Sequence, residues 1–295
     1  MTYLLLIIQQ LIAASTHLVA KSVTGELHPT MVVLIRGLFT AVAYGLWVMM
    51  KRRSLKRVDR SDLGLLLLLG LVNLPVNQLL FIWGVKFTTA PNAALAYALT
   101  PIFVVLMLVI SRREWPGPRR ILGIVLALVG AVIVLVDKGA SISSEHMLGN
   151  IMVLGASASW AVYTVAGRRM IMKYGAFHAT ALTFFTGVAI YIPIWWLIPV
   201  PADTAALVGS SAVSVWSQLF YLGVVTSGIG YGLWYYALTH LDASRVAVFN
   251  NLQPIFTTIM ALIIFGTQPT PAFLIGGLIA LGGVVVTQWE TKRPS

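Results

Sequence analysis

The chain has 295 residues, of which 58% are hydrophobic and only 10% are charged, with a formal net charge of +11. Ordinary soluble domains carry about 25% charged residues, so this composition indicates a polytopic membrane protein. The absence of cysteine excludes disulfides, cysteine-ligated metals, iron–sulfur clusters and thiol nucleophiles.

Ten apolar runs are long enough to cross a bilayer, because a spanning helix needs about 20 mostly apolar residues. In chain order they cover residues 4–22, 30–50, 62–85, 91–110, 118–136, 147–170, 177–198, 214–238, 244–265 and 270–289. The first run lacks a basic leading segment, and Gln9 and Gln10 interrupt it, which favours an uncleaved helix over a signal peptide. The sequence therefore predicts an all-α membrane protein with ten transmembrane helices.

The second half of the chain repeats the first at a shift of 153 residues. Residues 101–103, Pro-Ile-Phe, recur as residues 254–256. Further pairs at this shift are Gly70 and Gly223, Ala94 and Ala247, Gly123 and Gly276, and Gly130 and Gly283. The last two pairs give helices 5 and 10 a face of small residues, which predicts close packing against a neighbouring helix or a second subunit. We expect two five-helix units, residues 1–137 and 138–295.

The basic residues predict the orientation of these units. Residues 51–60 hold six Lys or Arg, residues 111–120 hold four and residues 168–173 hold three. Together with Arg245, Lys292 and Arg293, they make up 16 of the 20. By the positive-inside rule, these connections and both termini are expected in the cytoplasm. The charge thus reflects topology, with a contribution from anionic lipids, and does not point to nucleic acid.

The equivalent connections of the second unit, 199–213 and 265–271, contain no Lys or Arg. Five helices is an odd number, so a second copy would enter the membrane upside down and place these connections on the opposite side. Duplication and charge asymmetry therefore both predict an inverted repeat, with these connections in the periplasm.

Polar and aromatic side chains gather at similar depths in the expected helices, and amides in hydrocarbon should point into the bundle. Asn73 and Asn77, like Trp160 and Tyr163, are spaced to share a helix face. Prolines near the bilayer midplane interrupt helices 4 and 9, where inverted-repeat carriers place their substrate. The candidate substrate-cavity residues are His17, Asn73, Asn77, Tyr97, Pro101, Trp160, Tyr163, Trp234, Asn250 and Pro254.

Few charges fall within the expected spans. None of the nine acidic residues lies in the middle of one, which disfavours a proton-coupled carrier of cationic drugs. Arg36 either attracts a substrate carboxylate or snorkels to the membrane surface. His17 is either a neutral hydrogen-bonding group or a proton carrier. No nucleotide-binding loop, metal motif or hydrolase elbow is present, so we expect no cofactor, no metal and no enzymatic activity.

The repeated proline-centred helices and the glycine-spaced last helix of each unit resemble the EamA branch of the drug/metabolite transporter superfamily. The resemblance rests on residues 92–103, on Glu114 before the Gly123–Gly130 face, and on their second-copy counterparts. Family members carry an acidic residue before the last helix of each copy. Glu114 fits this pattern in the first copy, whereas Thr267 departs from it in the second. Within the family, the aromatic cavity looks like the bacterial YddG-type aromatic amino-acid exporters.

Together these features predict an inner-membrane exporter of amino acids, preferring aromatic or apolar ones, that works by alternating access as a monomer or homodimer in the lipid bilayer. The alternative is an exporter of other metabolites or drugs, such as nucleosides or lipophilic cations. A channel is disfavoured because no ring of charge or carbonyl filter is visible. An intramembrane enzyme is disfavoured because no catalytic pair is visible.

Overall fold

The computed structural model describes residues 1–112, 116–137, 146–198, 213–265 and 270–288. Glu114 and Thr267 lie outside these ranges. Within them the structure is helical. The first half contains α1 (Thr2–Glu26), α2 (Pro29–Lys51), η1 (Arg60–Asp62), α3 (Leu63–Leu71), η2 (Val72–Gln78), α4 (Leu79–Phe87), α5 (Ala90–Ala98), α6 (Thr100–Arg112) and α7 (Pro118–Asp137). The second half contains α8 (Met147–Tyr174), α9 (Ala176–Leu197), α11 (Val213–Phe220), η4 (Tyr221–Gly230), α12 (Tyr231–His240), α13 (Ala243–Ala247), η5 (Val248–Leu252), α14 (Gln253–Phe265) and α15 (Pro271–Gln288).

Eight helices in the described ranges are long and apolar enough to span a membrane. Three of them, 60–87, 92–111 and 213–240, are each assembled from two or more consecutive elements. The eight correspond to all the predicted runs except 118–136 and 244–265, which are helical in the structure but are not among the eight. Large apolar side chains such as Met50, Ile110 and Leu278 lie exposed on the outside, as expected for a surface that faces lipid.

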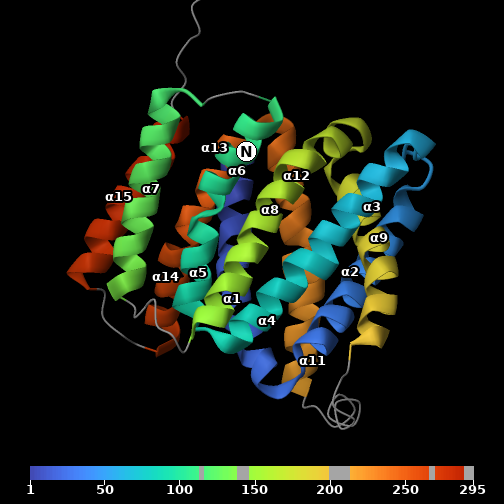
Figure 1. Ribbon diagram of the computed structural model, residues 1–295, viewed down its shortest axis with the longest axis horizontal. Coiled ribbons are helices and arrows are strands. Elements are labelled where there is room, and N and C mark those ends of the chain that lie inside the picture. The colour runs from blue at the N-terminus through green and yellow to red at the C-terminus, as the bar shows by residue number, and fades with distance from the viewer. Residues whose placement is uncertain (113–115, 138–145, 199–212, 266–269, 289–295) are drawn as a thin grey trace, which may run out of the picture.

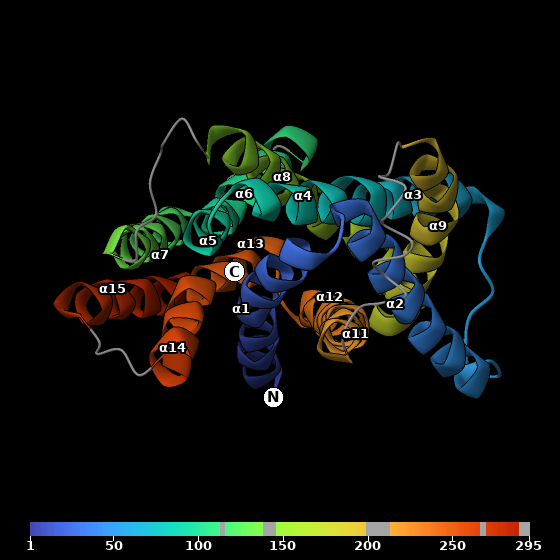
Figure 2. The same ribbon diagram turned by 90° about the horizontal axis from the view of Figure 1, so that it is seen from below.

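The helices form two layers, seen end-on in Figure 2. One row contains α7, α5, α6, α8, α4 and α3, and the other contains α15, α14, α1, α12 and α2, with α9 closing the end beside α2 and α3. Along the bundle, the helices run side by side at a tilt (Figure 1). Segments from both halves of the chain therefore face each other across the middle.

The helices bend at corresponding places in the two halves. Wide π-helical turns form η2 in the third run, two residues after Gly70, and η4 in the eighth run, which contains Gly223. The fourth run stops at Ala98 and restarts at Thr100, and the ninth narrows to the 3₁₀ segment η5 before Gln253. The two repeated prolines, Pro101 and Pro254, each occupy the second position of the helix that follows the break, where a missing backbone N–H costs little.

The glycine-spaced helices α7 and α15 pack against each other along one end of the bundle. A Cβ on Gly276 would lie 2.8 Å from the carbonyl oxygen of Gly130, and one on Gly283 would lie 2.6 Å from that of Gly123. Their backbones approach so closely that no side chain fits between them. The small-residue face therefore packs against a neighbouring helix of the same chain, which was the first of the two alternatives.

The start of α1 and the end of α15 lie at the same end of the bundle. Tyr3 stacks on Phe249 with ring centroids 6.2 Å apart, and the Gln288 amide donates to the carbonyl oxygen of Arg245 at 3.0 Å. Both contacts reach the short stretch formed by α13 and η5. Both ends of the described chain therefore meet at one side of the bundle.

Candidate functional site

A small cavity lies between the two layers, with a volume of about 60 Å³, room for only a few water molecules. It draws its walls from ten elements, α1, α2, η2, α4, α5, α8, η4, α12, η5 and α14. The lining residues are Gln9, Ile12, Ala13, Thr16, His17, Arg36, Asn77, Phe81, Tyr97, Trp160, Thr226, Tyr231, Asn250 and Gln253. Each lining element belongs to a helix that is interrupted at one of the places described above, or to a helix that packs against such an interruption.

One side of the cavity is aromatic. Trp160 and Tyr231 meet edge to face with ring centroids 4.6 Å apart, and Phe81 and Tyr97 do so at 5.6 Å. Offset and edge-to-face arrangements are the favourable geometries for aromatic rings. The wall is thus packed as a preformed apolar surface.

Asn77 fixes the polar edges of this aromatic wall. Its Nδ2 donates to the carbonyl oxygen of Ala156 at 2.7 Å and lies 3.2 Å from the Tyr97 hydroxyl, and its Oδ1 accepts from the Tyr231 hydroxyl at 3.3 Å. Because this buried amide links η2, α5, α8 and α12, it holds together elements of both halves. Its hydrogen-bonding capacity is largely used within the protein.

A chain of amides joins α1 to the η5–α14 stretch, and three of its members, Gln9, Asn250 and Gln253, form another wall of the cavity. Gln10 Nε2 donates to Gln9 Oε1 at 2.7 Å and to Asn250 Oδ1 at 3.2 Å. Gln253 Nε2 donates to Gln10 Oε1 at 3.0 Å and to Asn250 Oδ1 at 3.1 Å, while its Oε1 lies 2.9 Å from His17 Nε2. The amides are neutral and the imidazole of His17 can be neutral, so this wall offers hydrogen bonds without a fixed charge.

Arg36 supplies the one formal charge among the lining residues. Its side chain is only 2% exposed, so it points into the bundle and does not snorkel. Nε donates to the Ser227 hydroxyl at 2.7 Å and Nη2 to the Thr226 hydroxyl at 3.1 Å, but Nη1 has no partner. No ion pair is formed by Arg36 with any carboxylate in the described ranges. A buried guanidinium compensated only by hydroxyls is a costly arrangement unless an anion completes it.

Five of the predicted cavity residues line this cavity: His17, Asn77, Tyr97, Trp160 and Asn250. The other five do not: Asn73, Pro101, Tyr163, Trp234 and Pro254. Two of these five support the wall from behind. Tyr163 stacks on Trp160 at 5.4 Å, and Trp234 lies against the same indole at 5.4 Å.

Several lining residues were absent from the predicted set. In the sequence, Gln9 and Gln10 interrupt the first apolar run, and two adjacent amides in a spanning helix are themselves a signal of an interior polar site. Phe81, Ile12 and Ala13 have no distinguishing signal, because apolar residues are common on every face of such helices. Arg36 had a signal, its charge, but the sequence left its direction open.

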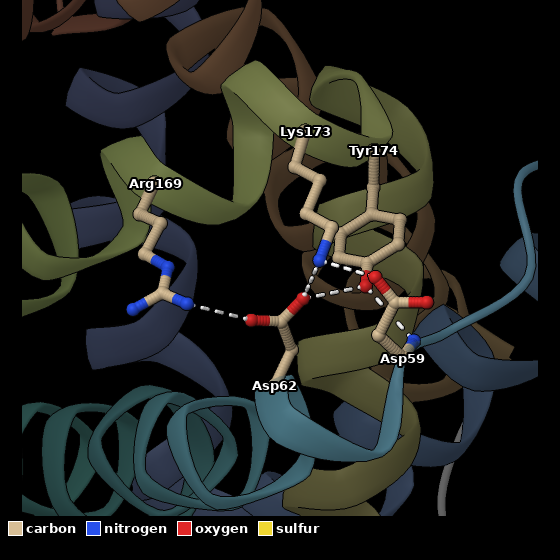
Figure 3. A network of polar contacts seen from close by, with 5 residues as sticks. All are labelled: Asp59, Asp62, Arg169, Lys173 and Tyr174. Atoms are coloured by element: carbon tan, nitrogen blue, oxygen red, sulfur yellow. Dashed lines mark hydrogen bonds and ion pairs between the residues drawn. The ribbon is translucent and has the colours of Figure 1, made fainter.

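A second polar cluster lies at the end of the bundle where the described chain begins and ends, and it is built from opposite charges (Figure 3). Asp62 accepts from Arg169 at 3.1 Å, from the Tyr174 hydroxyl at 2.7 Å and from the Lys173 ammonium. Lys173 also pairs with Asp59. The carboxylate of Asp62 is fully buried by these partners.

Asp242 forms a related but more open pair of contacts at the same end. Its carboxylate accepts from Arg120 at 3.1 Å and from Arg168 at 3.3 Å. These contacts tie the starts of α13 and α7 to α8. Within the ranges described, no group of three or more histidine and acidic side chains could hold a metal ion.

Comparison with known proteins identifies the kind of molecule to which this architecture belongs. The model of the EamA-like transporter family matches residues 1–136 and 147–289. A protein of Archaeoglobus fulgidus named an uncharacterised transporter is 33% identical over 291 residues, which is 97% of this chain and 96% of that protein.

More distant relatives carry substrate names. A probable terminal-alkyne amino-acid exporter of Streptantibioticus cattleyicolor is 25% identical, covering 81% of this chain and 77% of its own. A biotin transporter of Escherichia coli is 26% identical, covering 99% and 95%. A crystal structure with 20% identity superposes with a TM-score of 0.76 over 97% of this chain and 96% of its own, which shows a shared fold. The chain is therefore a multi-pass membrane transporter, and it belongs to the EamA-like transporter family.

Proposed function

We propose that this transporter exports amino acids, preferring aromatic or other apolar ones. The observation that carries the proposal is the buried Arg36 guanidinium, which lies in the cavity without a carboxylate partner among the described residues. A substrate carboxylate would supply the missing anion through short, charge-assisted hydrogen bonds. The aromatic wall of the same cavity would accept an apolar side chain by stacking and burial.

The named relatives support a substrate of this chemistry. Amino acids and biotin, the substrates in the names of two relatives, both carry a carboxylate on a compact body. A carrier of small carboxylates in general is therefore the second candidate. Nucleosides and lipophilic cations, which lack a carboxylate, would leave Arg36 uncompensated.

We further propose that transport proceeds by alternating access between two inverted five-helix units, 1–137 and 138–295, which together cross a bacterial inner membrane ten times. The matching helix breaks of the two halves support this arrangement. Pro101 and Pro254, beside those breaks, would serve as hinges. Both ends of the described chain lie at the same end of the bundle as the Arg and Lys side chains that surround Asp62 and Asp242. This shared location supports placing both termini in the cytoplasm.

The experiment uses purified protein in proteoliposomes and measures uptake of labelled phenylalanine, threonine and a lipophilic cationic dye, with and without a pH gradient. Saturable phenylalanine uptake that shows counterflow, without dye uptake, is the expected result. Dye uptake without amino-acid uptake would overturn the proposal. Counterflow also separates a carrier from a channel.

A charge variant tests the role of Arg36 directly. Replacing Ser227 by Asp places a carboxylate beside Arg36 Nε, so the internal anion should compete with the substrate. Phenylalanine uptake should fall by at least tenfold. Ser227→Asn is the matched control, because it has the same size without the charge and should transport far better. Equal transport by the two variants would contradict a carboxylate site at Arg36.

A further inference from the structure

Three side chains that line the cavity each hold one buried polar atom that has no hydrogen-bond partner within the described structure. The atoms are Arg36 Nη1, Asn250 Nδ2 and His17 Nδ1, and all three residues line the same cavity. Each side chain is at most 2% exposed, so bulk water does not reach these atoms freely. Buried polar atoms are normally paired, so three orphans around one cavity point to a ligand that completes them.

The amide chain determines which ring nitrogen of His17 donates a hydrogen bond and which one accepts. Gln253 donates through Nε2 to two oxygens, Gln10 Oε1 and Asn250 Oδ1, so its Oε1 faces the histidine ring. With this orientation His17 Nε2 must carry the hydrogen and donate to Gln253. Nδ1 of the neutral ring then has a free lone pair and acts as an acceptor. The three orphans are therefore two donors and one acceptor.

We propose that His17 Nδ1 accepts a hydrogen bond from the α-ammonium group of the substrate, while Arg36 Nη1 and Asn250 Nδ2 donate to its carboxylate. This deepens the proposed function and rests on it. Two donors complete a carboxylate, and the acceptor completes the ammonium group, so the orphan set matches the head of an α-amino acid. A carboxylate that lacks the amine would leave His17 Nδ1 unpaired.

The surroundings of His17 suit a cation held by neutral groups. Phe81 and Tyr97 pack edge to face against the imidazole, with ring centroids at 5.4 and 5.7 Å. Their rings add the weak attraction that aromatic groups have for ammonium ions. Since no acidic side chain lines the cavity, the ammonium group would be recognised without a counter-ion. Such recognition favours zwitterions over simple cations.

The test compares two ligands that differ only in the amine, phenylalanine and 3-phenylpropionate, as competitors of labelled phenylalanine uptake. The wild-type protein should prefer phenylalanine by roughly tenfold or more, the effect of one hydrogen bond to a charged group. His17→Phe keeps an aromatic ring but removes the acceptor, and should bring the preference close to one. His17→Gln retains an acceptor oxygen and should keep part of the preference.

His28→Phe is the matched control, because His28 precedes α2 and is not among the cavity-lining residues. It should leave the preference unchanged. A histidine that only braces α1 against α14 would weaken both competitors equally on substitution, so an unchanged ratio in His17→Phe would overturn the inference.

The preference of the wild-type protein for phenylalanine over 3-phenylpropionate tests the inference by itself, even if the variants cannot be purified. Equal competition by both ligands would overturn the role of His17 while leaving a carboxylate carrier in place. If neither ligand competed, the amino-acid proposal itself would fail, and this inference with it.

Discussion

The central cavity and the charged end of the bundle, where Asp62 and its partners lie, differ in how their ionic groups are compensated. At the charged end, Asp62 is surrounded by Arg169, Lys173 and Tyr174, and its carboxylate is satisfied within the protein (Figure 3). In the cavity, Arg36 meets only two hydroxyls, and one of its nitrogens has no partner. A charge matched by the protein serves the structure, whereas an unmatched charge in a cavity is available to a ligand.

The comparison makes a sharp physical prediction. Removing one member of a matched buried set leaves the others uncompensated and destabilises the fold. Removing an unmatched buried charge relieves a desolvation cost and leaves no opposite charge uncompensated. Stability and transport should therefore respond in opposite ways at the two places.

The largest effect on transport is expected for Arg36→Gln. The variant loses the positive charge that would bind the substrate carboxylate, so phenylalanine uptake below saturation should fall by roughly 10- to 100-fold. The thermal unfolding midpoint in detergent should stay the same or rise. A fall in that midpoint comparable to the loss of transport would show that Arg36 is structural.

The largest effect on stability is expected for Asp62→Asn, which leaves Arg169 and Lys173 without their shared carboxylate. The unfolding midpoint should fall by several degrees. Lys173 keeps Asp59 as a partner in this variant, so adding Arg169→Met, which removes the charge that has lost its carboxylate, should recover part of the loss. If the double variant were no better than the single one, the pairing would not carry the stability.

A smaller effect is expected at the aromatic wall. Trp160→Leu removes the ring that meets Tyr231, so the affinity for phenylalanine relative to leucine should fall by roughly 3- to 10-fold in competition assays. Trp216→Leu is a suitable control, because Trp216 is 37% exposed and does not line the cavity. An equal loss for phenylalanine and leucine would indicate damage to the cavity rather than lost aromatic selectivity.

The smallest effect is expected for Asp242→Asn. The side chain of Asp242 is 46% exposed and those of its partners, Arg120 and Arg168, are 30% exposed, so solvent screens these pairs. The loss of stability should be below about 1 kcal/mol. It should shrink further in 0.5 M salt, whereas the loss in Asp62→Asn should persist. Equal salt responses would remove the distinction between the buried and the open cluster.

The sequence predicted an all-helical membrane protein, and eight of its ten apolar runs match helices that are long and apolar enough to span a membrane, because hydropathy and helix breakers are local features of the sequence. It also predicted that Gly123 and Gly130 face a close neighbour, since small residues at a two-turn spacing leave a flat surface. Which neighbour this would be was not readable, because α15 begins more than 130 residues later. The partner of a helix face is set by packing between distant segments.

The cavity was predictable only in part for the same reason. Trp160 and Tyr163 share a side of α8, yet only Trp160 lines the cavity, because the rotation of α8 is fixed by its neighbours. Likewise, Asn77 reaches the cavity and Asn73 does not, although they lie only four residues apart. Arg36 had an obvious charge, but only the positions of Thr226 and Ser227 on η4 reveal that it turns inward.

The contact between α7 and α15 has a consequence for the order of assembly during synthesis. Gly130 meets Gly276, which is made 146 residues later, and Gly123 meets Gly283, made 160 residues later. At about 5–20 residues per second, α7 waits roughly 7–30 s in the membrane before its partner exists. During that interval its glycine face must be covered by lipid or by another protein. The first half of this transporter is therefore a vulnerable intermediate, and the last helix to emerge is the one that closes the bundle.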